Sequence, residues 1–307
     1  MREFQIGARR ITDETPAYVI AELGHNHGGS FDTARQMIQS AARSGADAVK
    51  LQKRDIDTLY SAEMLAAPYA HENSFGSTYG THRRNLELGL NTYIALRTVA
   101  QVSQVTFFAT AFDEVSADLL MEVGVPAIKL ASSSLTDLPL LRHVRTLGVP
   151  LVLSTGGGTL AHVDTAVAVL AGVPLALLHC TAAYPMLTVT EANLRVIEVM
   201  RARYPDHVIG WSSHDPGIML SIVAYAYGAR IIEKHVTLNR ASKGTDHAFS
   251  LEPRGLATLC EDLKKAHGAS GDGVKRLYES ERKPLSKMQR SWTADGWRVT
   301  GRCTYDP

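Results

Sequence analysis

Two histidines stand at equivalent places in the C-terminal half of the chain. His214 directly follows the apolar run 208–213, and His235 follows a second such run, residues 230–234. A segment of helical length separates the runs, so we expect two parallel strands joined by a crossover, with both imidazoles at the same strand ends. A single strand-end histidine is more often a hydrogen-bonded structural residue, but the pair is a good start for a divalent-metal site.

Two lysines lie inside apolar runs, Lys50 in DAVKLQ and Lys129 in AIKLAS. A buried ammonium group without an anionic partner is costly, so each lysine needs one. Glu22 or Glu233 could provide it, and so could the phosphate or carboxylate of a bound ligand. We favour a ring of donors for a small polyanion, because hydroxyl groups and the glycine-rich turn STGGG follow nearby strands. The candidate hydroxyl donors are Ser132, Ser154 and Thr155.

Short apolar runs alternate with segments of helical length along most of the chain. The runs are apolar throughout, as in strands covered on both faces. We predict strands at residues 18–23, 48–52, 106–110, 127–132, 150–154, 175–180, 208–213 and 230–235. We predict helices at residues 32–43, 91–104, 114–123, 138–146, 160–170, 191–203, 217–227 and 255–267. Eight such units favour an α/β fold of the (β/α)8 TIM-barrel type, and no dinucleotide-binding glycine motif follows the first strand.

The barrel prediction also divides the chain. We expect a hairpin or cap over residues 1–16, a TIM-barrel catalytic domain over 17–270 and a C-terminal extension over 271–307. One connection, residues 54–91, is long and polar, which predicts either a functional lid or partial disorder. It leaves the carboxyl end of the second strand, where barrel enzymes build their sites.

The composition is that of a soluble globular protein, with 45% hydrophobic and 21% charged residues among 307. Lys and Arg number 32 against 31 Asp and Glu, so there is no global electrostatic case for nucleic acid or an anionic membrane. The N-terminal residues have no signal-peptide core, and we expect a cytoplasmic location. Three widely spaced cysteines argue against a disulfide framework.

Several motifs, in order along the chain, resemble the sialic acid synthase family (N-acetylneuraminate synthase, NeuB-like). They are AELGHNHGGSFDTARQMIQSAARSGADAVKLQ, KLASSSLTDLPLLRHV, LVLSTGG, LLHCTAAYP, WSSHDPGI, EKHVTL and GTDHAFSLEP. The resemblance implies a TIM-barrel transferase of carbohydrate biosynthesis that condenses phosphoenolpyruvate with an aldose or related aldehyde. The products would be a 2-keto-3-deoxy sugar acid and phosphate, and the enzyme would be a homodimer.

The resemblance also implies roles for individual residues. His214 and His235 match ligands of a divalent cation, usually Mn²⁺ or Mg²⁺, which polarises the aldehyde as a Lewis acid. Glu22 matches an acid beside the metal. The positions that hold the phosphate and carboxylate of phosphoenolpyruvate are Lys50, Thr110, Lys129, Ser132, Ser154 and Ser212. The positions that face the sugar are Gln52, Tyr184 and Asp246.

Three departures from the family pattern bear on the acceptor. Ser134 stands where the family usually has an acidic residue, and we keep it as a candidate substrate-binding residue. Ala182 replaces an Asn or Ser that contacts phosphoenolpyruvate in the family. The chain ends at Pro307, about where the family's C-terminal antifreeze-like (SAF) domain would begin. We therefore expect a barrel-only synthase whose acceptor is not N-acetylmannosamine, with the 54–91 segment as a substitute lid.

Two other hypotheses remain open. Lys129 could form a Schiff base with a keto acid, as in an aldolase. The chain could also be a catalytically silent homologue that binds a sugar or a partner protein, because a fold does not guarantee an activity.

Borohydride treatment in the presence of pyruvate separates the synthase from the aldolase. We expect no covalent adduct, because the synthase reaction passes through no imine. The mass of the intact protein before and after treatment measures this, and a stable addition to Lys129 would support the aldolase instead.

Overall fold

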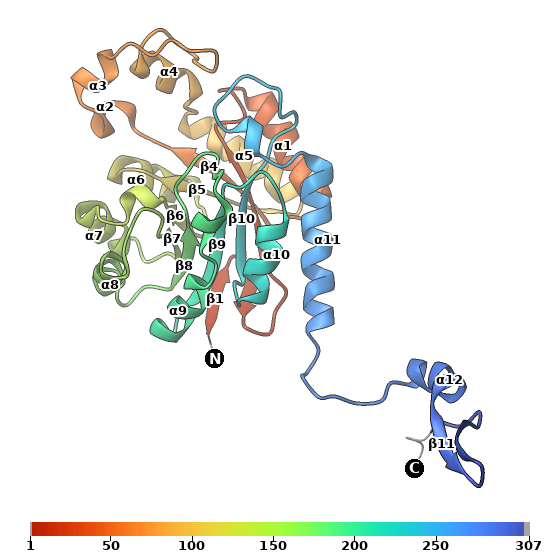
Figure 1. Cartoon of the computed structure of the whole chain (residues 1–307). Helices are drawn as coiled ribbons and strands as arrows, with labels where there is room; N and C mark the ends of the chain where they lie inside the picture. Colours follow the sequence, from red (N-terminus) through yellow and green to blue (C-terminus); the bar gives the residue numbers. More distant parts are fainter. Residues whose placement is uncertain (1, 304–307) are drawn as a thin grey trace. The chain divides into compact units, whose positions relative to one another are not determined.

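The computed structural model describes residues 2–303. The chain forms two compact units, one ending at His267 and the other beginning at Gly268, and Figure 1 shows their elements. The first unit contains a closed barrel of parallel strands in the order β10-β3-β4-β5-β6-β7-β8-β9. This barrel confirms the predicted (β/α)8 fold.

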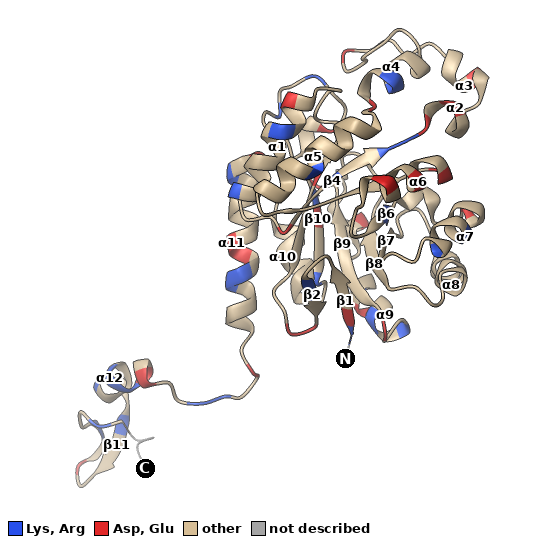
Figure 2. Cartoon of the chain, turned by 180° about the vertical axis from the view of Figure 1, so that it is seen from behind, with Lys and Arg blue, Asp and Glu red and all other residues tan. Residues whose placement is uncertain are grey.

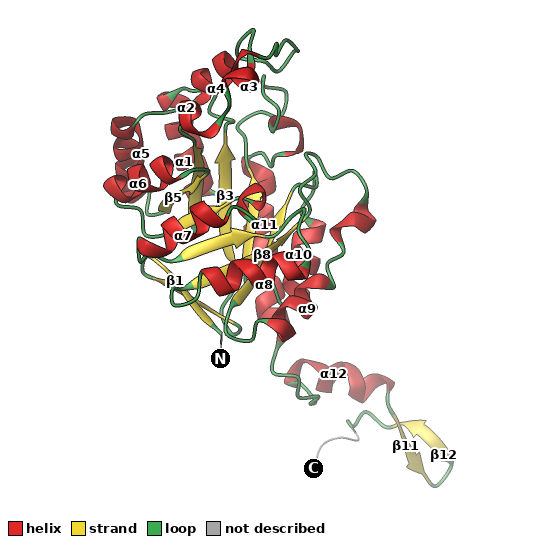
Figure 3. Cartoon of the chain, turned by 90° about the vertical axis from the view of Figure 1, so that its left-hand side faces the viewer, coloured by secondary structure: helices red, strands yellow, loops and turns green. Residues whose placement is uncertain are grey.

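The barrel strands coincide with the predicted apolar runs, and helices surround them (Figure 3). The strands are β3 (Tyr18–Gly24), β4 (Ala48–Lys53), β5 (Thr106–Ala111), β6 (Ile128–Leu130), β7 (Leu151–Ser154), β8 (Leu175–Cys180), β9 (Val208–Ser213) and β10 (Ile231–His235). The main helices of this unit are α1 (Phe31–Arg43), α5 (Leu90–Val102), α6 (Glu114–Val123), α7 (Leu138–Thr146), α8 (Leu160–Val169), α9 (Val196–Arg203), α10 (Met219–Ala226) and α11 (Pro253–Ser270). Within residues 2–303, no helix is both long and apolar enough to cross a bilayer.

Two predicted elements were wrong in their extent. The fourth predicted strand ends early, at Leu130, because the chain turns into a 3-10 helix, η1 (Ser132–Ser134). The helix expected after the sixth strand is broken into η2 (Val189–Ala192) and α9. Asn193 separates the two pieces with a φ of 38°, a left-handed conformation that asparagine tolerates better than most residues.

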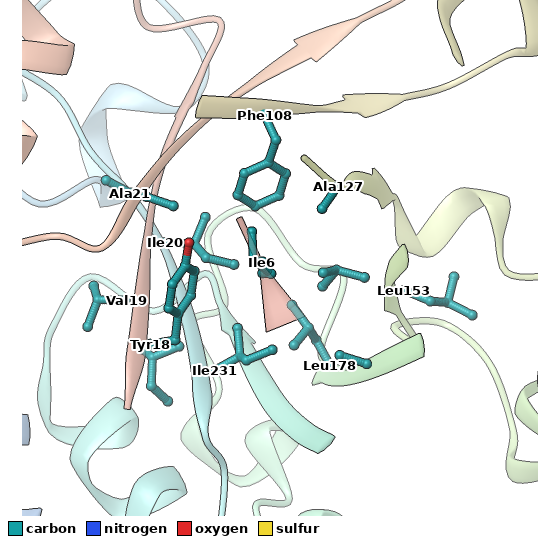
Figure 4. Close-up of a cluster of buried hydrophobic side chains, with 14 of the residues drawn as sticks. Ile6, Tyr18, Val19, Ile20, Ala21, Phe108, Ala127, Leu153, Leu178 and Ile231 are labelled. Carbon is teal, nitrogen blue, oxygen red and sulfur yellow. The ribbon is translucent and has the colours of Figure 1, made fainter. Parts of the chain in front are cut away.

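An N-terminal hairpin closes one end of the barrel. Strands β1 (Glu3–Ile6) and β2 (Arg9–Thr12) pair antiparallel. Ile6 is fully buried, and Figure 4 shows it among barrel side chains that include Tyr18 and Ile231. Because Tyr18 and Ile231 begin their strands, the hairpin covers the amino ends of the strands. The carboxyl ends are left for the site.

The long connection after β4 is a folded segment with helices. It contains α2 (Ile56–Leu59), α3 (Ala62–Ala66) and α4 (Tyr79–Leu86), which Figure 1 shows beyond the end of β4. Each helix starts at a residue whose side chain accepts a hydrogen bond from the first turn. The Oδ1 atom of Asn73 accepts a 3.0 Å hydrogen bond from the Gly244 backbone, which ties the segment to the loop after β10.

The second unit has secondary structure that the sequence analysis did not predict. It contains α12 (Glu279–Met288) and a hairpin of β11 (Arg290–Thr293) and β12 (Gly296–Val299). The rings of Trp292 and Trp297 pack edge to face across the hairpin, with centroids 5.9 Å apart. The two strands are four residues long and largely exposed, so they have no apolar run to reveal them.

Gly210 in β9 provides a test of the barrel packing. A Cβ atom at this position would lie 2.5 Å from the backbone oxygen of Ile231, which cannot move without disturbing β10. We expect Gly210→Ala to lower the free energy of unfolding by about 1–3 kcal/mol, measured by urea unfolding. Gly268→Ala is the control, because a Cβ there meets nothing within 4 Å. Equal stability of the Gly210 variant and the wild type would contradict the packing described here.

Candidate functional site

The carboxyl ends of the barrel strands surround a cavity of about 670 Å³. Parallel strands bring their last residues to the same rim of a barrel, so side chains far apart in the sequence meet there. The predicted site residues that line this cavity are Glu22, Lys50, Gln52, Thr110, Lys129, Ser132, Ser154, Tyr184, Ser212, His214, His235 and Asp246.

Two of the candidate residues do not line the cavity. The hydroxyl of Thr155 instead donates a 3.1 Å hydrogen bond to the backbone oxygen of Leu178, and the other residue is Ser134. It is buried in η1, where its backbone N–H donates to the carbonyl of Ala131. The tight turn presents Ser132 and Ser133 to the cavity instead. The hydroxyl of Ser132 accepts a 3.0 Å hydrogen bond from the Gly156 backbone, which connects the turn to the STGGG loop.

Two lysines and two glutamates form a buried ionic cluster in the cavity wall. Lys50 lies beside Glu22 on the neighbouring strand, and the two form an ion pair. Glu233 lies between the lysines: its Oε2 is 3.8 Å from Nζ of Lys50, and its Oε1 is 3.8 Å from Nζ of Lys129. All four residues are at most 6% exposed. Both glutamates predicted as partners therefore lie beside a lysine: Glu22 pairs with Lys50, and Glu233 lies near both Lys50 and Lys129.

The two carboxyl groups of the cluster differ in acidity. Burial alone would raise the pKa of Glu233, but Lys129 and Lys50 hold it at about 2. At Glu22 burial dominates over the charge of Lys50 and raises the pKa to about 7. Two ammonium groups and one ionised carboxylate leave one positive charge when Glu22 is protonated. An anionic ligand can neutralise that charge.

Hydroxyl groups extend the polar ring around the cluster. Thr110 Oγ1 and Ser154 Oγ each accept a 2.6 Å hydrogen bond from one of the two lysines. The hydroxyl of Ser212 donates a 2.9 Å hydrogen bond to Oε1 of Glu233. These bonds fix the direction of the charged groups, so the cavity offers a prearranged set of cations and neutral donors.

His214 and His235 lie next to the cluster, at the ends of the adjacent strands β9 and β10, with ring centroids 5.4 Å apart. Nδ1 of His214 is 3.0 Å from the carbonyl oxygen of Thr181, so Nδ1 carries the proton and the lone pair of Nε2 is free. Burial lowers the pKa of His214 to about 4 and also lowers the pKa of His235, so both rings are neutral at pH 7. Neutral imidazoles with a free lone pair are suited to bind a divalent cation.

Other features beside the histidines also fit a cation site. Nδ1 of His235 is buried without a hydrogen-bond partner and is 3.8 Å from Oδ2 of Asp246. Gly24 has a φ of 54°, and a Cβ there would lie 3.3–3.4 Å from atoms of His235, Asp246 and Glu22. Among residues 2–303, no group of three or more His, Cys, Asp or Glu side chains forms a metal cluster. The two histidines would therefore need oxygen ligands from water or substrate.

The outer part of the cavity contains residues that the sequence analysis missed. One of them is Arg54, which donates a 2.8 Å hydrogen bond to the predicted residue Gln52. Gln52 in turn donates a 3.1 Å hydrogen bond to Glu22. The Arg54 guanidinium stacks 3.6 Å from the centre of the Phe112 ring. His25 and Arg83 line the same cavity. The position of Arg54, directly after the second strand, could have revealed it, whereas a basic residue in a polar segment such as Arg83 usually indicates a solvated surface.

Comparisons with known proteins agree with this geometry. The sequence model of the family described as "NeuB family" matches residues 37–275. The N-acetylneuraminate-9-phosphate synthase of Mus musculus is 37% identical over 93% of this chain and 80% of its own length. The N,N'-diacetyllegionaminic acid synthase of Campylobacter jejuni is 36% identical over 90% of this chain and 84% of its own length. A sialic acid synthetase structure from Leptospira borgpetersenii, in complex with citrate, has a TM-score of 0.80, 32% identity, and coverage of 91% of this chain and 94% of that one.

Replacing Glu233 tests the ionic cluster. We expect Glu233→Gln to lower the free energy of unfolding by about 3 kcal/mol, because both buried lysines lose their shared carboxylate. Inorganic phosphate should stabilise this variant more than the wild type, since it can replace the missing anion. Thermal unfolding with and without phosphate measures both effects. Glu261→Gln, at an exposed pair with Lys265, is the control. A Glu233 variant as stable as the wild type would show that the lysines do not depend on this carboxylate.

Proposed function

Because this chain belongs to the NeuB family, we propose that it condenses phosphoenolpyruvate with a sugar aldehyde. The products are a 2-keto-3-deoxy sugar acid and inorganic phosphate. The observation that carries the proposal is the placement of two buried lysines and a pair of neutral histidines around one cavity. The lysines suit a small polyanion, and the histidines suit a divalent cation beside it.

Phosphoenolpyruvate occupies the inner part of the cavity in this proposal. Lys50 and Lys129 neutralise its phosphate and carboxylate groups, and nearby hydroxyl groups donate hydrogen bonds to the remaining oxygens. These hydroxyl groups belong to Thr110, Ser132, Ser154 and Ser212. The positive charge that remains beside Glu233 when Glu22 is protonated supports this placement, because a bound anion relieves it. C3 of the enol is thereby held facing the outer part of the cavity.

The sugar aldehyde occupies the outer part, where Gln52, Tyr184 and Asp246 orient it. The Tyr184 ring packs on His214 at a centroid distance of 4.2 Å, which places an aromatic surface beside the histidine pair. His214 and His235 hold a divalent cation, Mn²⁺ or Mg²⁺. When bound, this cation supplies Lewis-acid polarisation of the aldehyde oxygen.

Carbon–carbon bond formation uses the electron pair of the enol: C3 bonds to the aldehyde carbon, and the aldehyde oxygen becomes a hydroxyl group of the product. Water then adds at C2, and the C2–O bond to phosphate breaks as the keto group forms. Glu22 is the group placed to hold or move a proton in these steps. Its pKa, raised to about 7 by burial, lies near neutral pH, where a carboxyl group works as either acid or base.

A homodimer is part of the same proposal. The family resemblance implies it, and exposed apolar side chains on neighbouring connections of the barrel support it. Leu187 and Val189, after β8, are 79% and 63% exposed, and Met219, after β9, is 63% exposed. Exposed apolar side chains of this kind are suited to a subunit contact.

The activity is tested by incubating the protein with phosphoenolpyruvate, Mn²⁺ and a panel of sugar aldehydes, and measuring phosphate release and the mass of the product. We expect release that depends on the aldehyde and is lost after chelation. His214→Asn and His235→Asn should each reduce the rate at least about a hundredfold, because several kcal/mol of charge stabilisation is removed. His143→Asn, at an exposed pair with Asp118, should have no effect. Phosphate release that does not depend on an aldehyde, or that resists chelation, would contradict the proposal.

A further inference from the structure

One buried lysine of the barrel does not line the cavity and has no role in the function proposed above. Lys234 is fully buried in β10, and its side chain is directed to the outer face of the barrel, since Glu233 and His235 on either side of it line the cavity. Other charged residues lie at the surface: Figure 2 shows them along α11, where Glu261 and Lys265 form an exposed pair. A fully buried ammonium group is costly, so the position of Lys234 requires an explanation.

The ammonium group of Lys234 bonds to the residues on both sides of His214. Its Nζ donates a 3.0 Å hydrogen bond to the hydroxyl of Ser213 and one of 2.8 Å to Oδ1 of Asp215, and it also donates to the backbone oxygen of Asp215. These bonds use all three N–H groups of the ammonium. Oδ2 of Asp215 accepts a 3.1 Å hydrogen bond from the backbone of Gly217, which fixes the carboxylate in turn. The turn that contains His214 is therefore attached to β10 by a set of buried polar contacts.

These contacts connect β9 and β10 beyond the point where their backbone pairing ends. In the parallel register of the two strands, the last pair is Ser213 with Lys234. His214 comes directly after this pair, and the carbonyl oxygen near its Nδ1 belongs to Thr181, in the segment after β8. The side chain of Lys234 is therefore a direct link between the turn with His214 and the strand that carries His235.

The two histidines must keep their relative position to share one ion. Their ring centroids are 5.4 Å apart. His235 is fixed within β10, and its backbone oxygen accepts a 2.8 Å hydrogen bond from Leu251. Ligand groups of a binding site must be held within about 0.5 Å and 10–20° of the productive geometry. A small movement of the turn that contains His214 would therefore be enough to weaken the binding of a cation.

We propose that Lys234, paired with Asp215, is a positioning residue for the metal site, which holds the turn with His214 against β10 and keeps both imidazoles placed for one divalent cation. The inference rests on the cation site of the proposed function. Lys234 itself touches neither the cation nor the substrates. A buried ion pair that only stabilises the fold can be replaced by uncharged side chains without loss, and the experiment tests for this difference.

Replacement of Lys234 by methionine removes the charge and keeps an unbranched side chain. We expect Lys234→Met to raise the Kd for Mn²⁺ by about tenfold to a hundredfold, the usual effect of removing a group that supports metal ligands. Isothermal titration of Mn²⁺ into the protein measures this without any turnover. The Kd for phosphoenolpyruvate, measured in the presence of a chelator, should be the same in both proteins, because Lys50 and Lys129 keep their own partners in the cavity.

A double variant separates positioning from stability. Lys234→Met leaves Asp215 buried without its cation and should lower the melting temperature. Adding Asp215→Asn removes the unpaired charge, so the double variant should regain most of the lost stability in thermal unfolding. Its affinity for Mn²⁺ should remain weak, because the contacts from β10 to the turn with His214 are still missing. Mn²⁺ affinity that recovers together with stability would show a merely structural role and overturn the inference.

The matched control is Arg201→Met, which breaks an ion pair in another part of the barrel unit. Arg201 is partly buried, lies 2.6 Å from Asp13 and donates a 2.9 Å hydrogen bond to the backbone oxygen of Gly228. This variant should lose stability and bind Mn²⁺ as the wild type does. A loss of Mn²⁺ affinity equal to that of Lys234→Met would show that destabilisation alone weakens the site, and the inference would fail.

Nuclear magnetic resonance of the histidine rings in the metal-free protein separates this inference from the proposed cation site. We expect the ring resonances of His214 to shift in Lys234→Met and in the double variant, and to stay unchanged in Arg201→Met. If the wild type and the Lys234 variants bind Mn²⁺ equally well, the cation site stands and the positioning role is overturned. If the wild type binds no Mn²⁺, the cation site fails. A His214 shift confined to the Lys234 variants then still supports the positioning role, and unchanged resonances overturn it.

Discussion

Two ammonium groups buried in an apolar barrel share one fully ionised carboxylate, and the inner part of the site depends on this arrangement. Glu233 lies at the same distance from Lys50 and Lys129, and hydroxyl groups of neighbouring strands complete their hydrogen bonds. An apolar replacement would give the fold at less electrostatic cost. The cluster is therefore best understood as a binding feature, because protonation of Glu22 leaves a positive charge that an anion can neutralise.

The barrel separates stability from function along its axis. At the amino ends of the strands, Ile6 of the N-terminal hairpin packs among the apolar side chains of the barrel strands. At the carboxyl ends, the same strands present ionisable and hydroxyl-bearing side chains to the cavity. The long connection after β4 adds a second, separately anchored wall with its own cations. The inner and outer parts of the cavity can thus recognise different ends of two substrates.

Much of the fold could be predicted from the sequence, because strands covered on both faces must be apolar along their whole length. Eight such runs, each followed by a helical segment, specify a barrel with few alternatives. The errors occurred where local backbone geometry overrides the apolar pattern. Examples are the 3-10 turn that buries Ser134 and the left-handed residue Asn193. The hairpin with Trp292 and Trp297 was missed because its short strands are largely exposed.

The sequence by itself determined which chemical groups stand at the strand ends: the histidine pair, the interior lysines and the hydroxyls that follow them. It did so because a charged or polar residue at the end of an apolar strand needs a partner, and the neighbouring residues in the sequence are enough to identify such a position. Only the tertiary structure decided that Glu233 joins Lys50 to Lys129, that Ser134 does not line the cavity, and that Arg83 of α4 does. These relations depend on which strands are neighbours and how a long connection folds back, and such distances between remote residues have no local signature.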